Sequence, residues 1–136
     1  MTKSDIGNLI EQVESGNLSL RADAATFVVL EKACEERIFK IAQIKSAIRA
    51  VADQEVWGIG EQAAVLTSAQ TLVRRFREKA ADGPNNAYDT LEGHRVAAEE
   101  LLTLFRTIRK SYEVSDAEFA AKFKELASAQ GLDIGE

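Results

Sequence analysis

The sequence predicts an all-α protein, a helical hairpin of two long amphipathic arms with extra short helices at its ends. Apolar residues recur at intervals of three and four along two long stretches, and this spacing keeps them on one side of a helix. Alanine is abundant, and the β-branched residues are scattered rather than gathered into short runs. The length of 136 residues fits a single helical domain over 1–136.

A short helix is expected first. Ser4 or Asp5 can cap a helix over 4–15, because their side-chain oxygens accept hydrogen bonds from the first free backbone N–H groups. Gly16 is expected to end this helix, since glycine adopts the left-handed conformation of a helix end at little cost. A connector from Asn17 to Leu20 then leads to the first long arm.

The first long arm is predicted over 22–53, a helix about 45 Å long at ~1.5 Å per residue. A lone helix cannot bury a stripe of this length, so the stripe needs a partner helix from the same chain or from another. The apolar residues follow one another at steps of three or four, and they are Phe27, Leu30, Cys34, Ile38, Ile41, Ile44, Ile48 and Val51.

The hairpin turn is placed at 57–60. Gly58 and Gly60 lie two residues apart, and each permits a positive φ and weakens a helix. Trp57, the sole tryptophan, lies directly on this turn.

The second arm is predicted in two pieces, over 61–81 and 86–112. Pro84 interrupts it, and the sequence leaves open whether the proline kinks one arm or separates two helices. A short terminal helix over 115–129 is expected to start at Ser115, with an acid three residues later completing a capping box. The second piece carries the most regular stripe of the chain, made of Leu91, His94, Ala98, Leu101, Phe105, Ile108 and Tyr112.

The two stripes together predict the surface by which the chain pairs. When the arms close on each other, part of both stripes stays uncovered. A second hairpin over this seam gives a four-helix bundle on dimerisation, with an interface of ~2,000 Å² or more. The expected interface positions are Phe27, Leu30, Ile38, Ile41, Ile48, Leu91, Leu101, Phe105 and Ile108.

Charge and hydropathy argue against two classes of partner. The net charge of -5, from 22 acidic and 17 basic side chains, repels nucleic acid phosphates, so no nucleic acid partner is expected. No apolar run approaches the ~18 residues of a membrane span, so no membrane insertion is expected. A basic, apolar and small-residue leader of the general secretory type is missing from the first residues, so export would need another route.

Catalysis and metal binding are not predicted. His94, the only histidine, is expected within or beside the packed seam rather than as a base. Cys34 is expected as a buried small apolar residue rather than a reactive thiol. The sequence lacks the clustered carboxylates or cysteines of a metal site and a Gly-rich phosphate loop. We therefore expect no enzyme activity, cofactor or metal.

Two features occur in a distinctive order. The Trp57-Gly58 turn lies between the two arms, and the second arm closes on Tyr112, which Asp116 follows four residues later. In this the chain resembles the WXG (ESAT-6-like) superfamily of type VII secretion substrates and the related secretion-associated proteins of actinobacteria. The family's turn reads Trp-x-Gly, whereas here Gly58 follows Trp57 directly and the next glycine is Gly60.

The resemblance implies a non-enzymatic type VII (ESX) secretion substrate or secretion-associated partner. It would be secreted, or placed at the cell surface, without a cleaved signal peptide. Tyr112 and Asp116 would form a Tyr-x-x-x-Asp export motif. The partners would be the chain itself or a related helical hairpin, and a secretion ATPase or chaperone if the protein is exported.

Other interpretations stay open beside this one. Tyr112 can serve as the last residue of the stripe, and Asp116 can stabilise the first turn of the last helix. The alternative function is that of a cytoplasmic helical adaptor or chaperone that binds a partner helix.

Overall fold

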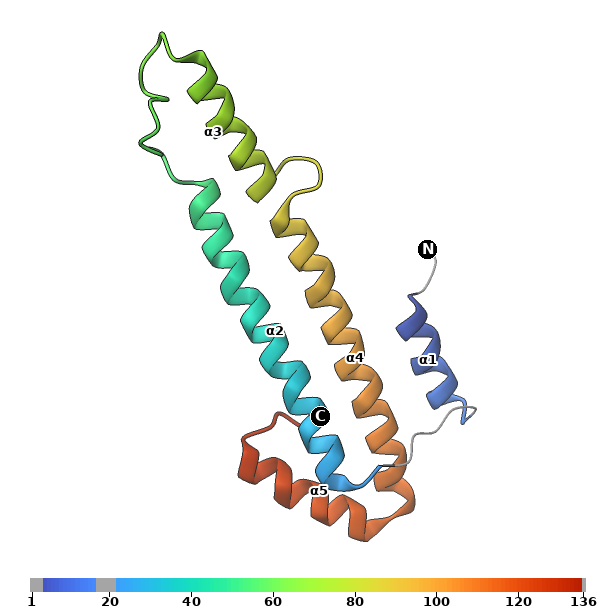
Figure 1. Cartoon of the computed structure of the whole chain (residues 1–136). Coiled ribbons are helices and arrows are strands. Elements are labelled where there is room, and N and C mark those ends of the chain that lie inside the picture. Colours follow the sequence, from blue (N-terminus) through green and yellow to red (C-terminus); the bar gives the residue numbers. More distant parts are fainter. Residues whose placement is uncertain (1–3, 17–21, 136) are drawn as a thin grey trace. The chain divides into compact units, whose positions relative to one another are not determined.

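A computed structural model describes residues 4–16 and 22–135, and within these ranges the chain forms five α-helices and no strand (Figure 1). The predicted all-α fold is confirmed. The expected connector from Asn17 to Leu20 lies outside the described residues. The helices are α1 (Asp5–Glu14), α2 (Ala24–Ala52), α3 (Thr67–Ala80), α4 (Ala87–Ser115) and α5 (Ala117–Gln130).

Side-chain caps explain where the first two helices begin. The Ser4 hydroxyl accepts a hydrogen bond from the Gly7 backbone N–H at 3.0 Å and so caps α1. The Asp23 carboxylate accepts one from the Thr26 N–H at 2.8 Å at the start of α2. Gly16, with a φ of 78°, follows α1 as expected.

The region around Pro84 separates two helices rather than kinking one. Asp82 and Asn85 adopt positive φ values of 70° and 55°, which no helix accommodates. The buried Asn86 side chain then accepts a hydrogen bond from the Asp89 N–H at 2.8 Å and donates one to the Gly83 carbonyl at 2.6 Å. These bonds fix both the turn and the start of α4.

Two predicted boundaries differ from the structure. Residues 61–66 were expected as helix but form turns, and α3 starts only at Thr67. The reason is that the Glu61 side chain accepts hydrogen bonds from the backbone of the preceding loop. Ser115 ends α4 rather than capping α5. Asp116 is the cap instead, and its carboxylate accepts from the Phe119 N–H at 3.0 Å.

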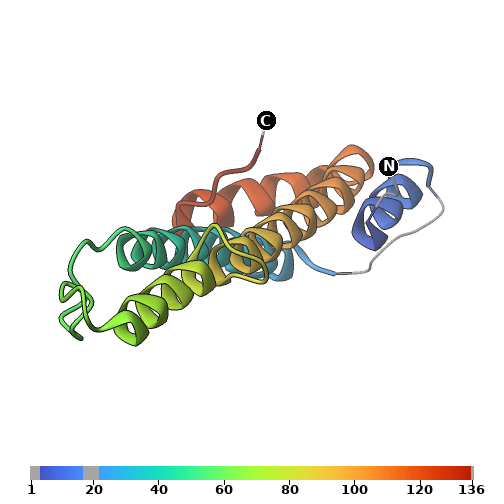
Figure 2. The same ribbon diagram turned by 90° about the horizontal axis from the view of Figure 1, so that it is seen from above.

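The residues group into two compact units, to both of which α2 and α4 contribute. Unit 1 comprises the chain up to Ile38 and from Val96 onward, and unit 2 comprises Phe39–Arg95. In unit 1, α5 folds back from the end of α4 and packs against the first half of α2 (Figures 1 and 2). Its apolar core contains Val13, Ala24, Phe27, Val28, Leu104, Ile108, Phe123, Ala127 and Leu132.

An ion pair is buried in the same unit. Glu31 and Arg109 are 0% and 2% exposed, and the Arg109 guanidinium donates to both carboxylate oxygens of Glu31 at 3.0 Å. The guanidinium also donates to the Glu113 carboxylate and lies 4.2 Å from the centre of the Phe123 ring. This pair joins α2 to α4 across 78 positions of sequence.

Unit 2 holds its helices together mainly by polar contacts. Arg49 pairs with Asp82 at 2.6 Å, and Lys45 pairs with Glu92. The ring of Tyr88 lies under both cations, 4.5 Å from the Lys45 ammonium and 4.6 Å from the Arg49 guanidinium. The large apolar side chains that become buried here are Ile41 and Val73.

No helix within residues 4–16 and 22–135 combines the length and the apolar character that crossing a bilayer requires.

We predict that Arg109→Met lowers the free energy of unfolding by about 3–5 kcal/mol, because the buried Glu31 carboxylate loses both guanidinium hydrogen bonds and keeps only Arg106, whose Nε lies 3.8 Å away. Urea denaturation followed by circular dichroism measures this change. The double variant Glu31→Leu with Arg109→Met should recover most of the loss, since it removes both buried charges.

The control is Lys122→Ala, which breaks the exposed pair with Glu125 and should cost less than about 1 kcal/mol. An Arg109→Met chain as stable as this control would show that the buried pair does not hold the unit.

Candidate interaction surface

The stripe predicted on α2 is only partly covered. Phe27 and Ile41 are buried, Leu30, Ile38 and Ile48 are half-buried, and Ile44 and Val51 are exposed. Phe39, outside the predicted stripe, is 64% exposed. The α2 residues of unit 2 therefore offer more apolar surface to solvent than those of unit 1.

The covered face of α4 matches the predicted stripe only in part. Of the predicted residues, Ala98 and Ile108 are buried, whereas Leu91, Leu101, Phe105 and Tyr112 are half-buried. His94 is exposed, so of the two expected places, within the seam or beside it, the first is wrong. The side chains that α4 buries beyond the predicted stripe are Leu102, Leu104 and Arg109. A straight α-helix has 3.6 residues per turn, so residues that repeat every seven positions rotate around it by about 20° per heptad. Over a long helix, such a stripe therefore moves away from the covered face.

Many of the large apolar residues of unit 2 are exposed. In the loop that joins α2 to α3, Val65 is 87% exposed and Val56 is 56% exposed. Single exposed apolar residues are ordinary, but so many in one small unit make it the candidate interaction surface. The exposed large apolar residues of unit 2 are Phe39, Ile44, Val51, Val56, Ile59, Val65, Leu66, Leu72 and Phe76.

Trp57 is anchored within this loop. Its ring stacks on Phe76 of α3 at 5.9 Å between centroids, and its indole N–H donates to the Gln54 carbonyl at 3.2 Å. Gly58 and Gly60 have φ values of 76° and 100°, so the predicted turn residues adopt left-handed backbone here.

The Glu61 carboxylate holds the backbone of this loop in one conformation. Glu61 accepts hydrogen bonds from three successive backbone N–H groups, those of Trp57, Gly58 and Ile59. The hydrogen bond from the backbone N–H of Glu61 itself, together with these three, lowers the pKa of the Glu61 carboxyl to about 2. Arg77 of α3 adds a hydrogen bond to the Gln54 carbonyl at 2.6 Å. The loop is therefore a defined structure rather than a loose tether.

Tyr112 and Asp116, the two residues of the expected export motif, also stabilise the fold. Tyr112 is half-buried in unit 1, where its ring lies 5.8 Å from that of Phe27 and 5.3 Å from that of Phe119. Asp116 is exposed and caps α5, and its backbone N–H donates to the Tyr112 carbonyl at 2.9 Å. The two residues thus lie together at the corner between α4 and α5.

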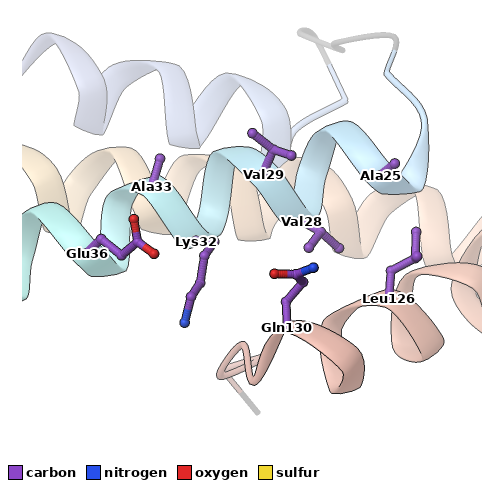
Figure 3. Close-up of a pocket in the computed structure, with 8 residues that line it drawn as sticks. All are labelled: Ala25, Val28, Val29, Lys32, Ala33, Glu36, Leu126 and Gln130. Atoms are coloured by element: carbon purple, nitrogen blue, oxygen red, sulfur yellow. The ribbon is translucent and has the colours of Figure 1, made fainter.

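An apolar groove that the sequence did not predict runs between α2 and α5 (Figure 3). It has a volume of 380 Å³. Val28 of α2 and Gln130 of α5 point toward each other, and Lys32 and Leu126 also line the groove. Val29, also in the lining, is 66% exposed. Ala25, Val29 and Ala33 lie four residues apart, so the sequence did indicate a second apolar face on this helix.

Groups with catalytic or metal-binding chemistry are dispersed. In the part of the chain that the structure describes, no three His, Cys, Asp or Glu side chains come together to hold a metal ion. Cys34 is buried, and this burial raises the pKa of its thiol, with the neighbouring Glu31 charge adding to the effect. The thiol is therefore poorly nucleophilic.

No family model matches this chain, and no curated protein or solved structure matches it either.

We predict that acid loosens the Trp57 loop through Glu61. The folded pKa of about 2 lies below the ordinary value, so the contribution to stability is complete above about pH 4.5 and is lost as the pH falls toward about 2. Trp57 fluorescence, which reports this loop alone, should change within that window and should not change there in Glu61→Gln.

Glu92→Gln is the matched control, since that carboxyl also has a pKa of about 2, held by Arg95 and Lys45, but does not touch the loop. A Glu61→Gln chain that titrates like the wild type would contradict the assignment.

Proposed function

We propose that this protein acts by pairing with another helical protein and has no catalytic role. The observation that carries the proposal is the exposure of large apolar side chains on the helices of unit 2, above all Phe39, Leu72 and Phe76. These residues come from α2 and α3, so the surface is helical and suits a helical partner. The partner is a second copy of the chain or a related helical hairpin.

The energetics of unit 2 support this proposal. Its exposed ion pair, Arg49 with Asp82, adds little stability in water, and its buried large apolar residues are few. Covering an exposed phenylalanine or leucine contributes roughly 1.5–3 kcal/mol each. A paired hairpin burying ~2,000 Å² would supply the apolar contact that unit 2 lacks alone.

Within this class we propose a type VII secretion substrate or secretion-associated partner. Three features support it: the Trp57 loop between the arms, the exposed Asp116, and the backbone hydrogen bond that holds Asp116 to Tyr112 at the same corner. A secretion ATPase or chaperone can recognise a folded junction between two helices such as this one. The protein would then be secreted, or lie at the cell surface, by a route that needs no cleaved signal peptide.

A second candidate, a cytoplasmic adaptor or chaperone, is favoured by the groove between α2 and α5. A groove with an apolar floor suits the apolar face of a partner helix. Fractionation of a host under secreting conditions separates the two candidates, since an adaptor stays in the cytoplasm.

We predict that the purified chain forms a dimer whose dissociation constant rises by about 100-fold in the double variant Phe39→Glu with Phe76→Glu, because buried charges replace aromatic anchors. Light scattering across a dilution series measures this change.

Val114→Glu, which changes a 90% exposed residue of unit 1, should leave the dimer intact. A wild-type chain that stays monomeric at every concentration would contradict self-pairing and leave a different hairpin as the partner.

We predict that Asp116→Asn and Tyr112→Phe each reduce export about tenfold without loss of stability. Asparagine is as good a cap as aspartate, and phenylalanine keeps the ring packing, so the helix cap and the aromatic contacts both persist in these variants. Secreted and cellular fractions are compared by immunoblot, and stability by thermal unfolding.

Tyr88→Phe and Glu92→Gln form the control, because these two residues have the same spacing of four and lie at the other end of α4. Export at wild-type level by both Tyr112→Phe and Asp116→Asn would remove the signal assignment.

A further inference from the structure

Helix α3 carries a charge opposite in sign to that of the chain as a whole. Four basic residues and one acidic residue give this helix a net charge of +3, whereas the whole chain carries -5. The basic residues are Arg74, Arg75, Arg77 and Lys79, and the acidic one is Glu78. A basic helix on an acidic protein attracts a partner whose charge differs from that of the protein itself.

Two of these cations border an apolar strip on one side of α3. Leu72, Arg75, Phe76 and Lys79 occupy positions i, i+3, i+4 and i+7, so they are neighbours on the surface of the helix. All four residues are exposed. We call these four residues the α3 patch. The patch combines two large apolar side chains with two cations beside them.

The cations of the α3 patch are not engaged by carboxylates of the chain. Within residues 4–16 and 22–135, neither Arg75 nor Lys79 forms an ion pair. Lys79 donates to the Pro84 carbonyl at 3.4 Å, which is a long hydrogen bond. Arg77, which lies outside the patch, is instead bonded to the Gln54 carbonyl of the Trp57 loop. The two patch cations therefore remain available to a partner.

A hollow of 330 Å³ adjoins the patch at Leu72 and Arg75. Three hydroxyl residues complete its lining, namely Thr67, Ser68 and Thr71. A carboxylate in this hollow would accept hydrogen bonds from a guanidinium and from hydroxyl groups, and bonds between ionised groups are the stronger kind. The hollow thus suits an acidic side chain that lies next to an apolar contact.

We propose that the α3 patch docks an acidic amphipathic helix of a partner hairpin. The apolar side of that helix covers Leu72 and Phe76, and its carboxylates meet Arg75 and Lys79. This inference rests on the proposed pairing through unit 2 and adds the charge of the partner to it. Two copies of α3 would not face each other, because like charges would then oppose across the interface.

A partner helix is favoured over an anionic lipid surface. The net charge of -5 opposes the approach of the whole chain to a negatively charged bilayer. A single helix that contacts the patch has to match only the local charge, since exposed charges more than about 10 Å away are screened at ordinary salt concentrations.

The test uses two synthetic amphipathic peptides of about 21 residues, a length at which an isolated helix can form. They share one leucine face, and its flanks carry glutamate in one peptide and lysine in the other. Fluorescence anisotropy of the labelled peptides measures their binding to the full chain. The emission of Trp57, whose ring stacks on Phe76, reports whether the peptide docks at the patch.

The wild-type chain should bind the glutamate peptide about tenfold more tightly than the lysine peptide, although its net charge alone favours the lysine peptide. The double variant Arg75→Glu with Lys79→Glu should reverse this preference and keep its helical circular dichroism, since both positions are exposed. Arg74→Glu with Lys124→Glu is the matched control. It changes the net charge equally, but Arg74 lies across the helix from the apolar strip and Lys124 lies on α5, so the wild-type preference should persist.

Equal binding of the two peptides by the wild type would overturn the acidic partner, as would a charge-reversed variant that keeps the wild-type preference. Pairing through the apolar side chains of unit 2 would survive that result, because the dilution series tests it separately. Binding of neither peptide would also overturn the inference. A chain that binds phosphatidylserine vesicles but not the glutamate peptide would show that the α3 patch is a lipid-binding surface instead.

Discussion

The arrangement of unit 1 depends on the ion pair between Glu31 and Arg109. Neither charge can be buried alone, because removing one ion from water costs several kcal/mol that only a well-placed counter-ion offsets. The forked guanidinium meets both carboxylate oxygens in one geometry, and that geometry fixes the register of α2 against α4. Apolar contacts alone would tolerate a slide along the helix axis, whereas this pair does not.

The same arginine connects several layers of the unit. It lies over the Phe123 ring of α5, bonds Glu113 on its own helix, and donates to the Ile134 carbonyl in the segment that follows α5. Core packing, the docking of α5 and the position of this segment are thus coupled through one side chain.

Unit 2 is held together mainly by polar contacts rather than by a buried ion pair and an apolar core. Its contacts are cations paired with carboxylates near solvent, a tyrosine beneath two of those cations, and a loop held by the Glu61 carboxylate. Such interactions specify a conformation, yet they contribute little free energy in water. A unit that is well specified but poorly covered suits a protein that completes its apolar packing on a partner. In the Trp57 loop and at the Tyr112 corner, the candidate recognition residues also hold the fold, so only conservative substitutions can separate the two roles.

The sequence by itself determined local features of this protein: the helical segments, the end of the first helix at Gly16, the turn at Gly58 and an interruption at Pro84. Each of these depends on a few neighbouring residues and on backbone preferences that act within one turn. Tertiary structure decided which face of α4 is covered, which of Ser115 and Asp116 caps α5, and why residues 61–66 are not helical. It also decided that Glu31, which looks like an ordinary solvated acid in its heptad, is the most buried charge of unit 1. These outcomes depend on groups far apart in sequence, and periodicity carries no information about which distant residue will meet them.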